Sequence, residues 1–171
     1  MKIAITGKPR SGKTTLIKKL LSLIKKLDLK PWGFYTEEVR EGGKRVGFDL
    51  VFVPSGERFP LARVGGKPPR VGKYSVLVEN LERALGKGSG DLLILDEVGK
   101  MELLSPGFRE FLLEALQLPH AILTYGEGID RKIKEKIREN FRVFHLEVPS
   151  RQEVFNRISQ EIRREFGHKE N

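Results

Sequence analysis

Short apolar runs alternate with amphipathic segments along most of the chain. Residues 3–6 form a short, mostly apolar run that ends at Gly7, and residues 14–27 then place their apolar side chains on one helical face. Residues 92–95 are apolar without alternation, which is typical of a strand covered on both faces of a parallel sheet. The pattern therefore predicts strands and helices in alternation.

The second half of the chain continues this alternation. The predicted elements are a helix over Val78–Leu85, a helix that begins at Ser105-Pro106, a strand over Ala121–Tyr125, a helix over Ile129–Asn140, a strand over Val143–Val148 and a helix from Ser150 to Gly167. Ser150 and Glu153 have the spacing of a capping box, in which each side chain satisfies a backbone N–H at the helix start.

The region between the first helix and the second apolar run has a different rhythm. Residues 34–40 and 45–53 flank Gly42-Gly43, a pair that tolerates positive φ and predicts a hairpin, and residues 58–64 can return as a third strand. We expect this antiparallel elaboration either to be inserted between the first helix and the second core strand or to extend the edge of the sheet.

These elements predict an α/β fold: a mostly parallel sheet with helices on both faces and an antiparallel hairpin elaboration. The length of 171 residues suits one domain over residues 1–171. Cysteine is absent, which excludes disulfides and thiolate metal sites. No apolar stretch reaches the ~20 residues of a membrane span, and the N-terminus does not read as a signal peptide. We expect a monomeric, cytoplasmic protein without a membrane partner.

Charge adds a second expectation about partners. Lysine and arginine total 32 residues against 23 acids, a formal net charge of +9, which attracts polyanions such as nucleotides or nucleic acid. Basic and acidic residues are interspersed in segments such as 131–139, as on the charged surfaces of thermophile proteins. No recognised nucleic-acid-binding motif or basic tail occurs. We therefore favour a solvated charged surface over a dedicated nucleic-acid site.

The segment after the first predicted strand carries the clearest chemistry. It fits G-x-x-x-x-G-K-[ST] at every fixed position, and its glycines let successive backbone N–H groups point at an anion. The helix that begins near Lys13 adds its positive dipole end. Lys13 is expected to reach the β- and γ-phosphates of a nucleotide, and Thr14 to place its hydroxyl on Mg²⁺. The predicted nucleotide-binding residues here are Gly7, Lys8, Pro9, Arg10, Ser11, Gly12, Lys13, Thr14 and Thr15.

An acidic pair follows the second apolar run. Asp96 at the end of such a strand can hold Mg²⁺ through water, opposite Thr14. Glu97 is placed to polarise a water that attacks the γ-phosphate, which makes Glu97 and Lys13 the predicted catalytic residues. The alternative is that Glu97 is a surface acid at a strand end.

Three further positions have two interpretations each. Arg10 either contacts a phosphate or faces solvent. Lys100 lies close enough in sequence to meet phosphate or the neighbouring acids, or is a solvated lysine. Thr124, at the end of the strand over Ala121–Tyr125, is either a polar sensor of the γ-phosphate or a residue that finishes a strand.

Five segments in order resemble one known family. The segments are Gly7–Thr14, Gly33–Arg40, Val46–Leu50, Val71–Tyr74 and Asp96–Leu103. With these segments the chain is similar to the thermophilic nucleoside-triphosphatase family, which is related to the human cancer-related nucleoside-triphosphatase. The resemblance implies a RecA-like P-loop domain that hydrolyses several nucleoside triphosphates to the diphosphate and phosphate with Mg²⁺. It also implies a second nucleotide-contacting segment: Ile94, Leu95, Asp96, Glu97, Val98, Gly99, Lys100 and Met101.

The predicted function is Mg²⁺-dependent hydrolysis of ATP, GTP, CTP and UTP or TTP. Broad base use is expected because no base-recognition motif is visible, and Trp32, Phe34 and Tyr35 are either stacking candidates or core residues. Slow turnover is expected because no arginine finger can be identified. One alternative is a small-molecule or nucleotide kinase in which Arg131 and Arg138 belong to a lid. The other is a nucleic-acid-associated nucleotide switch.

Overall fold

The computed structural model describes residues 1–85 and 88–167, so residues 86–87 and 168–171 of the predicted domain lie outside the described residues. Within the described ranges a nine-stranded sheet has the order β5-β6-β4-β3-β2-β7-β8-β1-β9. The strands are β1 (Lys2–Thr6), β2 (Pro31–Glu41), β3 (Lys44–Val53), β4 (Arg58–Val64), β5 (Arg70–Val71), β6 (Tyr74–Val76), β7 (Leu92–Val98), β8 (Ala121–Tyr125) and β9 (Arg142–His145).

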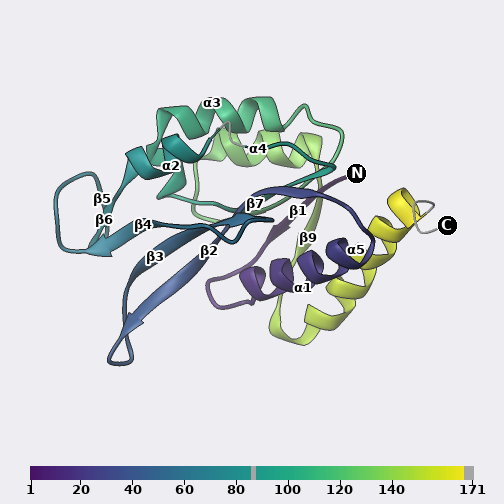
Figure 1. The fold of residues 1–171 in the computed structure, drawn as a ribbon, viewed down its shortest axis with the longest axis horizontal. Helices are drawn as coiled ribbons and strands as arrows, with labels where there is room; N and C mark the ends of the chain where they lie inside the picture. The colour runs from purple at the N-terminus through teal and green to yellow at the C-terminus, as the bar shows by residue number, and fades with distance from the viewer. Residues whose placement is uncertain (86–87, 168–171) are drawn as a thin grey trace.

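Helices cover both faces of this sheet (Figure 1). They are α1 (Lys13–Lys26), α2 (Val78–Ala84), α3 (Pro106–Ala115), α4 (Arg131–Asn140) and α5 (Arg151–Phe166), with short 3₁₀ turns η1 (Glu102–Leu104) and η2 (Val148–Ser150). Ile17 of α1 and Ile158 of α5 are fully buried on one face, and Phe108 of α3 and Ile137 of α4 on the other. Each such side chain contributes about 1.5–3 kcal/mol of hydrophobic burial. No helix of the described residues has the length and apolar character that crossing a membrane requires.

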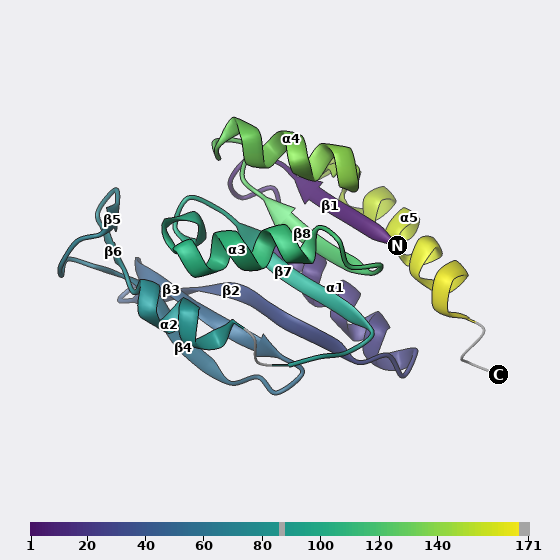
Figure 2. The ribbon, with the colours of Figure 1, turned by 90° about the horizontal axis from the view of Figure 1, so that it is seen from above.

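Five neighbouring strands form the parallel core. β2, β7, β8, β1 and β9 run parallel, so β8 separates β1, which precedes the glycine loop, from β7, which carries the acidic pair. Figure 2 shows β2, β7, β8 and β1 side by side. The carboxyl ends of β1, β7 and β8 therefore meet at one edge of the sheet, where α/β proteins place their ligands. This arrangement confirms the predicted fold class.

Strand β2 joins the parallel and antiparallel parts of the sheet. The sequence did not predict that one strand belongs to both parts. The strand begins at Pro31 rather than at Phe34. Its first residues, from Pro31 to Phe34, pair in parallel with β7, and the residues from Gly33 to Glu41 pair antiparallel with β3. Pro31 is tolerated because it is the first residue of the strand. At Gly33, with φ 109°, an added Cβ would lie 2.0 Å from the Ile94 carbonyl oxygen, so only glycine allows this close approach. The elaboration thus extends the sheet from a core strand.

Two element boundaries near the C-terminus differ from the predictions. Helix α4 begins at Arg131, two residues after Ile129, because the Asp130 side chain accepts a hydrogen bond from the Lys132 N–H (2.7 Å) and caps it. Ser150 does not cap α5. Its hydroxyl bonds the backbone of Glu147 instead, which forms the turn η2 and ends β9 before Val148.

Two short strands were also missed. Strands β5 and β6 pair with each other, and β6 pairs with β4. They contain two and three residues, respectively, which is too short for a periodic pattern to be recognised. By contrast, the predicted start of α3 is confirmed, because the Ser105 hydroxyl accepts a hydrogen bond from the Phe108 N–H (2.9 Å).

Candidate nucleotide site

The loop between β1 and α1 has the backbone of an anion site. Arg10 and Gly12 have positive φ values of 67° and 100°, so the chain turns sharply before α1 begins at Lys13. The first turn of α1 contains no acidic residue, which leaves the positive end of the helix dipole available for an anion.

The ammonium group of Lys13 lies across this loop. Its Nζ donates to the carbonyl oxygens of Gly7 (2.8 Å) and Lys8 (3.4 Å), and it lies 3.9 Å from Glu97 Oε2. The side chain is only 11% exposed, so its charge is concentrated where the loop, α1 and the end of β7 meet. The structure therefore brings together the two residues predicted to be catalytic.

Asp96 is the buried centre of a hydrogen-bond network. Its side chain accepts from the hydroxyls of Thr14 (2.8 Å) and Thr124 (2.5 Å) and, at 3.5 Å, from the Thr36 N–H. Burial raises the pKa of Asp96, while these hydrogen bonds and the charge of Lys13 oppose the rise. Thr14 and Asp96, the two predicted metal ligands, are in direct contact.

Thr124 donates its hydrogen bond to Asp96 from the buried side, away from the cleft. It is fully buried and is not among the residues that line the cleft beside the loop. Sequence reasoning left open whether it senses the γ-phosphate, and that role stays a prediction. The contribution of Thr36 was not predicted, because only the pairing of β2 with β7 brings it to this edge.

Glu97 faces the cleft. Its side chain is 33% exposed, and burial of the carboxyl group raises its pKa, with Lys13 opposing and Asp96 adding to the rise. A carboxylate with a raised pKa is a better proton acceptor than a fully solvated one. The geometry allows Glu97 to act on a water in the cleft.

The cleft has a volume of about 920 Å³ and extends from the glycine loop to the antiparallel strands. Ligand sites commonly measure about 300–1,000 Å³, so the volume is sufficient for a nucleotide. The predicted nucleotide-binding residues that line it are Gly7, Lys8, Pro9, Arg10, Gly12, Lys13, Thr14, Thr15, Glu97, Gly99, Lys100 and Met101. Those that do not are Ser11, Ile94, Leu95, Asp96 and Val98.

The non-lining residues are buried, and Ile94, Leu95 and Val98 belong to the hydrophobic core. Direct contact of these three side chains with a nucleotide stays a prediction. Lys100 is exposed and lies beside the loop after β8, where an added Cβ on Gly128 would meet its Nζ at 3.4 Å.

Arg151 is a loop contact that sequence reasoning missed. From the start of α5 its Nε donates to the Ser11 carbonyl (2.6 Å) and its Nη2 to the Arg10 carbonyl (3.1 Å). These partners lie 140 and 141 residues away in the chain, and no local motif points to the contact. Arg151 therefore holds the outer side of the loop in its turned conformation.

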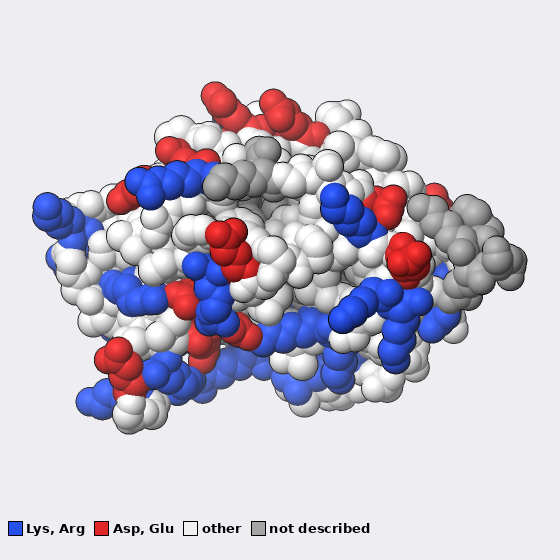
Figure 3. Space-filling model, viewed as in Figure 1, with Lys and Arg blue, Asp and Glu red and all other residues white. Residues whose placement is uncertain are grey.

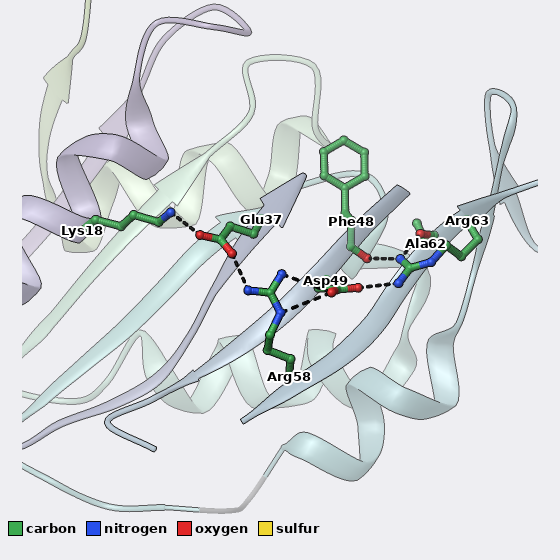
Figure 4. A network of polar contacts seen from close by, with 7 residues as sticks. All are labelled: Lys18, Glu37, Phe48, Asp49, Arg58, Ala62 and Arg63. Atoms are coloured by element: carbon green, nitrogen blue, oxygen red, sulfur yellow. Dashed lines mark hydrogen bonds and ion pairs between the residues drawn. The ribbon is translucent and has the colours of Figure 1, made fainter. Parts of the chain in front are cut away.

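Basic side chains gather across the lower half of the view in Figure 3. On the outer face of α1, Lys18, Lys19, Lys25 and Lys26 are exposed. On the neighbouring antiparallel strands, basic residues alternate with acids (Figure 4). Positive charge thus extends along α1 from the cleft, which Lys18 lines, and attracts anions.

The family model described as NTPase matches residues 2–159. This chain belongs to the NTPase family. Nucleoside-triphosphatase THEP1 of Archaeoglobus fulgidus is 42% identical over 166 residues, which covers 96% of this chain and 98% of the relative. The match confirms the predicted family and enzyme class, a nucleoside-triphosphatase.

Two solved structures of NTPase-family relatives have the same fold. The solution structure of a human cancer-related nucleoside triphosphatase superposes with a TM-score of 0.79 at 34% identity and covers 94% of this chain and 96% of that one. The crystal structure of THEP1 from the hyperthermophile Aquifex aeolicus gives a TM-score of 0.71 at 30% identity, with 92% and 96% covered. The mixed sheet with a parallel core is therefore shared across these relatives.

Proposed function

We propose that this NTPase-family member hydrolyses nucleoside triphosphates to the diphosphate and phosphate, with Mg²⁺ and with little discrimination among ATP, GTP, CTP, UTP and TTP. The observation that carries the proposal is the meeting of four side chains at one end of the cleft: Lys13, Thr14, Asp96 and Glu97. The names of the relatives describe the same reaction class.

Phosphate binding is assigned to the glycine loop. The backbone N–H groups of the loop and the start of α1 hold the phosphates, and Lys13 turns its ammonium from the loop carbonyls toward the β- and γ-phosphates. Lys13 is already confined there by two carbonyl oxygens and Glu97. Catalysis then comes mainly from positioning and charge neutralisation.

The oxygen atoms of Thr14 and Asp96 fit Mg²⁺. Mg²⁺ keeps several waters and binds through one or two carboxylates plus substrate phosphates. In keeping with this, the described residues contain no cluster of three or more His, Cys, Asp or Glu side chains around a common metal position. When bound, Mg²⁺ would neutralise charge on the β- and γ-phosphates.

Glu97 is the proposed general base. It orients a water in the cleft so that the water oxygen forms a bond to the γ-phosphorus while the bond from that phosphorus to the β,γ-bridging oxygen breaks. The bridging oxygen leaves with the electron pair as part of the diphosphate, and the water proton passes to Glu97. Its raised pKa and cleft-facing carboxylate support this role.

Broad base use is supported by the position of the aromatic candidates outside the cleft. Trp32, Phe34 and Tyr35 do not line the cleft; Phe34 is a core residue, and the other two pack against the core. The sequence contains no base-recognition motif, so discrimination should be modest. Phosphate release from the different triphosphates is expected to vary by less than about a hundredfold; a larger spread contradicts broad specificity.

The decisive experiment compares wild type with Glu97→Gln. The variant should bind a non-hydrolysable triphosphate with Mg²⁺ nearly as wild type does, while phosphate release falls by at least about tenfold. Omitting any acceptor also tests the kinase alternative, whose lid candidates Arg131 and Arg138 do not line the cleft. Wild-type turnover in Glu97→Gln, or phosphate release only with an added acceptor, would contradict the proposal.

A further inference from the structure

Glu102 is a buried acid to which the mechanism above gives no role. It stands in the turn η1, is only 4% exposed, and borders the cleft. Its Oε2 has no hydrogen-bond partner within the described part of the chain. Burial raises the pKa of Glu102 well above its usual range, and the nearby charge of Glu97 raises it further.

Such a group lowers the stability of a fold. A buried carboxyl with an unsatisfied oxygen has lost its hydration without a full replacement, and two other acids, Asp96 and Glu97, lie close enough to add repulsion. An apolar residue of similar size would remove this cost. A buried acid at this position therefore indicates a functional role rather than a stabilising one.

Gly99 brings the carboxyl groups of Glu97 and Glu102 to one small space. A Cβ added to Gly99 would lie 3.0 Å from Glu97 Oε1 and 3.3 Å from Glu102 Oε2. The turn that allows this is closed by the Leu103 N–H, which donates to the Gly99 carbonyl (3.0 Å). The missing side chain of Gly99 therefore leaves the two carboxyl groups bordering the same space.

We infer that Glu102 is a positioning residue: with its carboxyl group protonated, Oε2 donates a hydrogen bond to the Glu97 carboxylate and holds it in the orientation needed to align the attacking water. The inference rests on the proposed role of Glu97. In the structure Lys13 is the cation nearest Glu97, at 3.9 Å. When Lys13 turns to the phosphates, Glu97 keeps a neighbour on the side of Gly99. That neighbour is Glu102.

The test is a set of substitutions measured for kcat, KM and thermal stability. Glu102→Met keeps the length and removes the polar head, and we expect kcat to fall by at least about tenfold with KM within about twofold of wild type. Glu102→Gln keeps a hydrogen-bonding head, and kcat should remain within about threefold. Both variants should have a Tm at or above that of wild type, since the buried acid is gone.

Leu103→Ala is the matched control in the same turn. Leu103 is buried and carries no polar group, so its truncation should lower Tm and leave kcat within about twofold. If Glu102→Met lowers Tm and kcat together, as a packing defect does, or if Glu102→Gln loses as much activity as Glu102→Met, the positioning role is wrong.

A double-mutant cycle separates this inference from the proposed function. If Glu102 acts through Glu97, Glu97→Gln combined with Glu102→Met should be no slower than Glu97→Gln alone, within about twofold. Wild-type turnover in Glu97→Gln overturns the role of Glu97 and the inference with it. A large loss in Glu97→Gln with full activity in Glu102→Met, or fully additive losses, overturns the inference alone.

Discussion

Acidic side chains at the loop end of the cleft and on the antiparallel strands beside it differ in burial and in pairing with cations. At the loop end, Asp96 and Glu102 are 1% and 4% exposed, and burial raises the pKa of both. At the antiparallel end, Glu37 and Asp49 are partly exposed and paired with cations (Figure 4), and hydrogen bonds from Lys18 and Arg58 lower the pKa of Glu37. Acids that stay buried although their burial lowers the stability of the fold indicate a functional site, whereas partly exposed acids paired with cations are typical of a surface.

The antiparallel network is a chain of alternating charges across three strands. Arg58 of β4 contacts Glu37 of β2 at 2.5 Å and Asp49 of β3 at 3.2 Å, and Arg63 contacts Asp49 at 2.6 Å. Lys18 of α1 completes the chain by contacting Glu37. Every charge has an opposite neighbour, so the network joins strands without leaving a group free for a ligand.

The largest expected effect on phosphate release is the difference between two aspartate-to-asparagine substitutions, one at the loop end and one on the antiparallel strands. Asp96→Asn removes a predicted Mg²⁺ ligand and should lower phosphate release by at least about a hundredfold. Asp49→Asn, at the antiparallel end, should leave it within about twofold. Phosphate release is measured for both variants over a Mg²⁺ titration. Equal losses in the two variants would mean that the ends of the cleft do not differ as argued.

Sequence reasoning reached the parts of the site that are contiguous in the chain. The loop from Gly7 to Thr14 and the pair Asp96-Glu97 each follow an apolar strand, and parallel strands end at one edge of the sheet. Thr36 and Arg151 escaped prediction because their contacts depend on how β2 and α5 pack. Hydrophobic periodicity carries no information about which distant turn a polar side chain will meet.

The same limit explains the errors in the fold. Strand β2 was predicted to start at residue 34, but its pairing with β7 begins at Pro31. Ser150 and Glu153 had capping-box spacing, but Glu147 competes for the Ser150 hydroxyl. Local patterns located these elements, and tertiary contacts set where they begin and end.

Arg151 gives the next largest effect. Replacing it with Met removes two hydrogen bonds from a charged donor to the loop carbonyls of Ser11 and Arg10, and such bonds are worth about 1.5–3 kcal/mol each. We expect KM for triphosphate to rise by about five- to tenfold, because part of this energy now has to order the loop on binding. Arg157→Met on the same helix, which contacts Phe144 instead, is the control. Unchanged KM in Arg151→Met would show that the loop holds its own shape.

The contributions of Glu102 and Glu37 to the free energy of unfolding should change with pH in opposite directions. Because the folded-state pKa of Glu102 is raised, the folded chain binds a proton that the unfolded chain releases above about pH 4.3. Its contribution to stability therefore falls as pH rises from that value to the raised pKa. Glu102→Gln does not titrate, so its stability advantage over wild type should grow over this window and then stay constant.

For Glu37 the pKa is lowered, so its contribution to stability is present above the ordinary value and is lost as pH falls through the lowered pKa. Glu37→Gln should therefore be less stable than wild type at neutral pH and converge with it in acid. Denaturant unfolding of both variants between about pH 3 and 8 measures these differences. A parallel response in the two variants would contradict the contrast between the two ends.

The smallest effect is expected for Arg58→Met, although Arg58 makes more ion pairs than any residue named in the mechanism. Its side chain is 46% exposed, so water already screens its contacts with Glu37 and Asp49. The substitution should cost less than about 1 kcal/mol of unfolding free energy, and the cost should shrink further in high salt.

Phosphate release by Arg58→Met should stay within about twofold of wild type, because Arg58 does not line the cleft. Denaturant unfolding at low and high salt, run beside the phosphate assay, checks both. A tenfold loss of turnover with stability preserved would place the antiparallel strands within the catalytic unit, since Arg58 contacts Glu37, which lines the cleft together with Lys18.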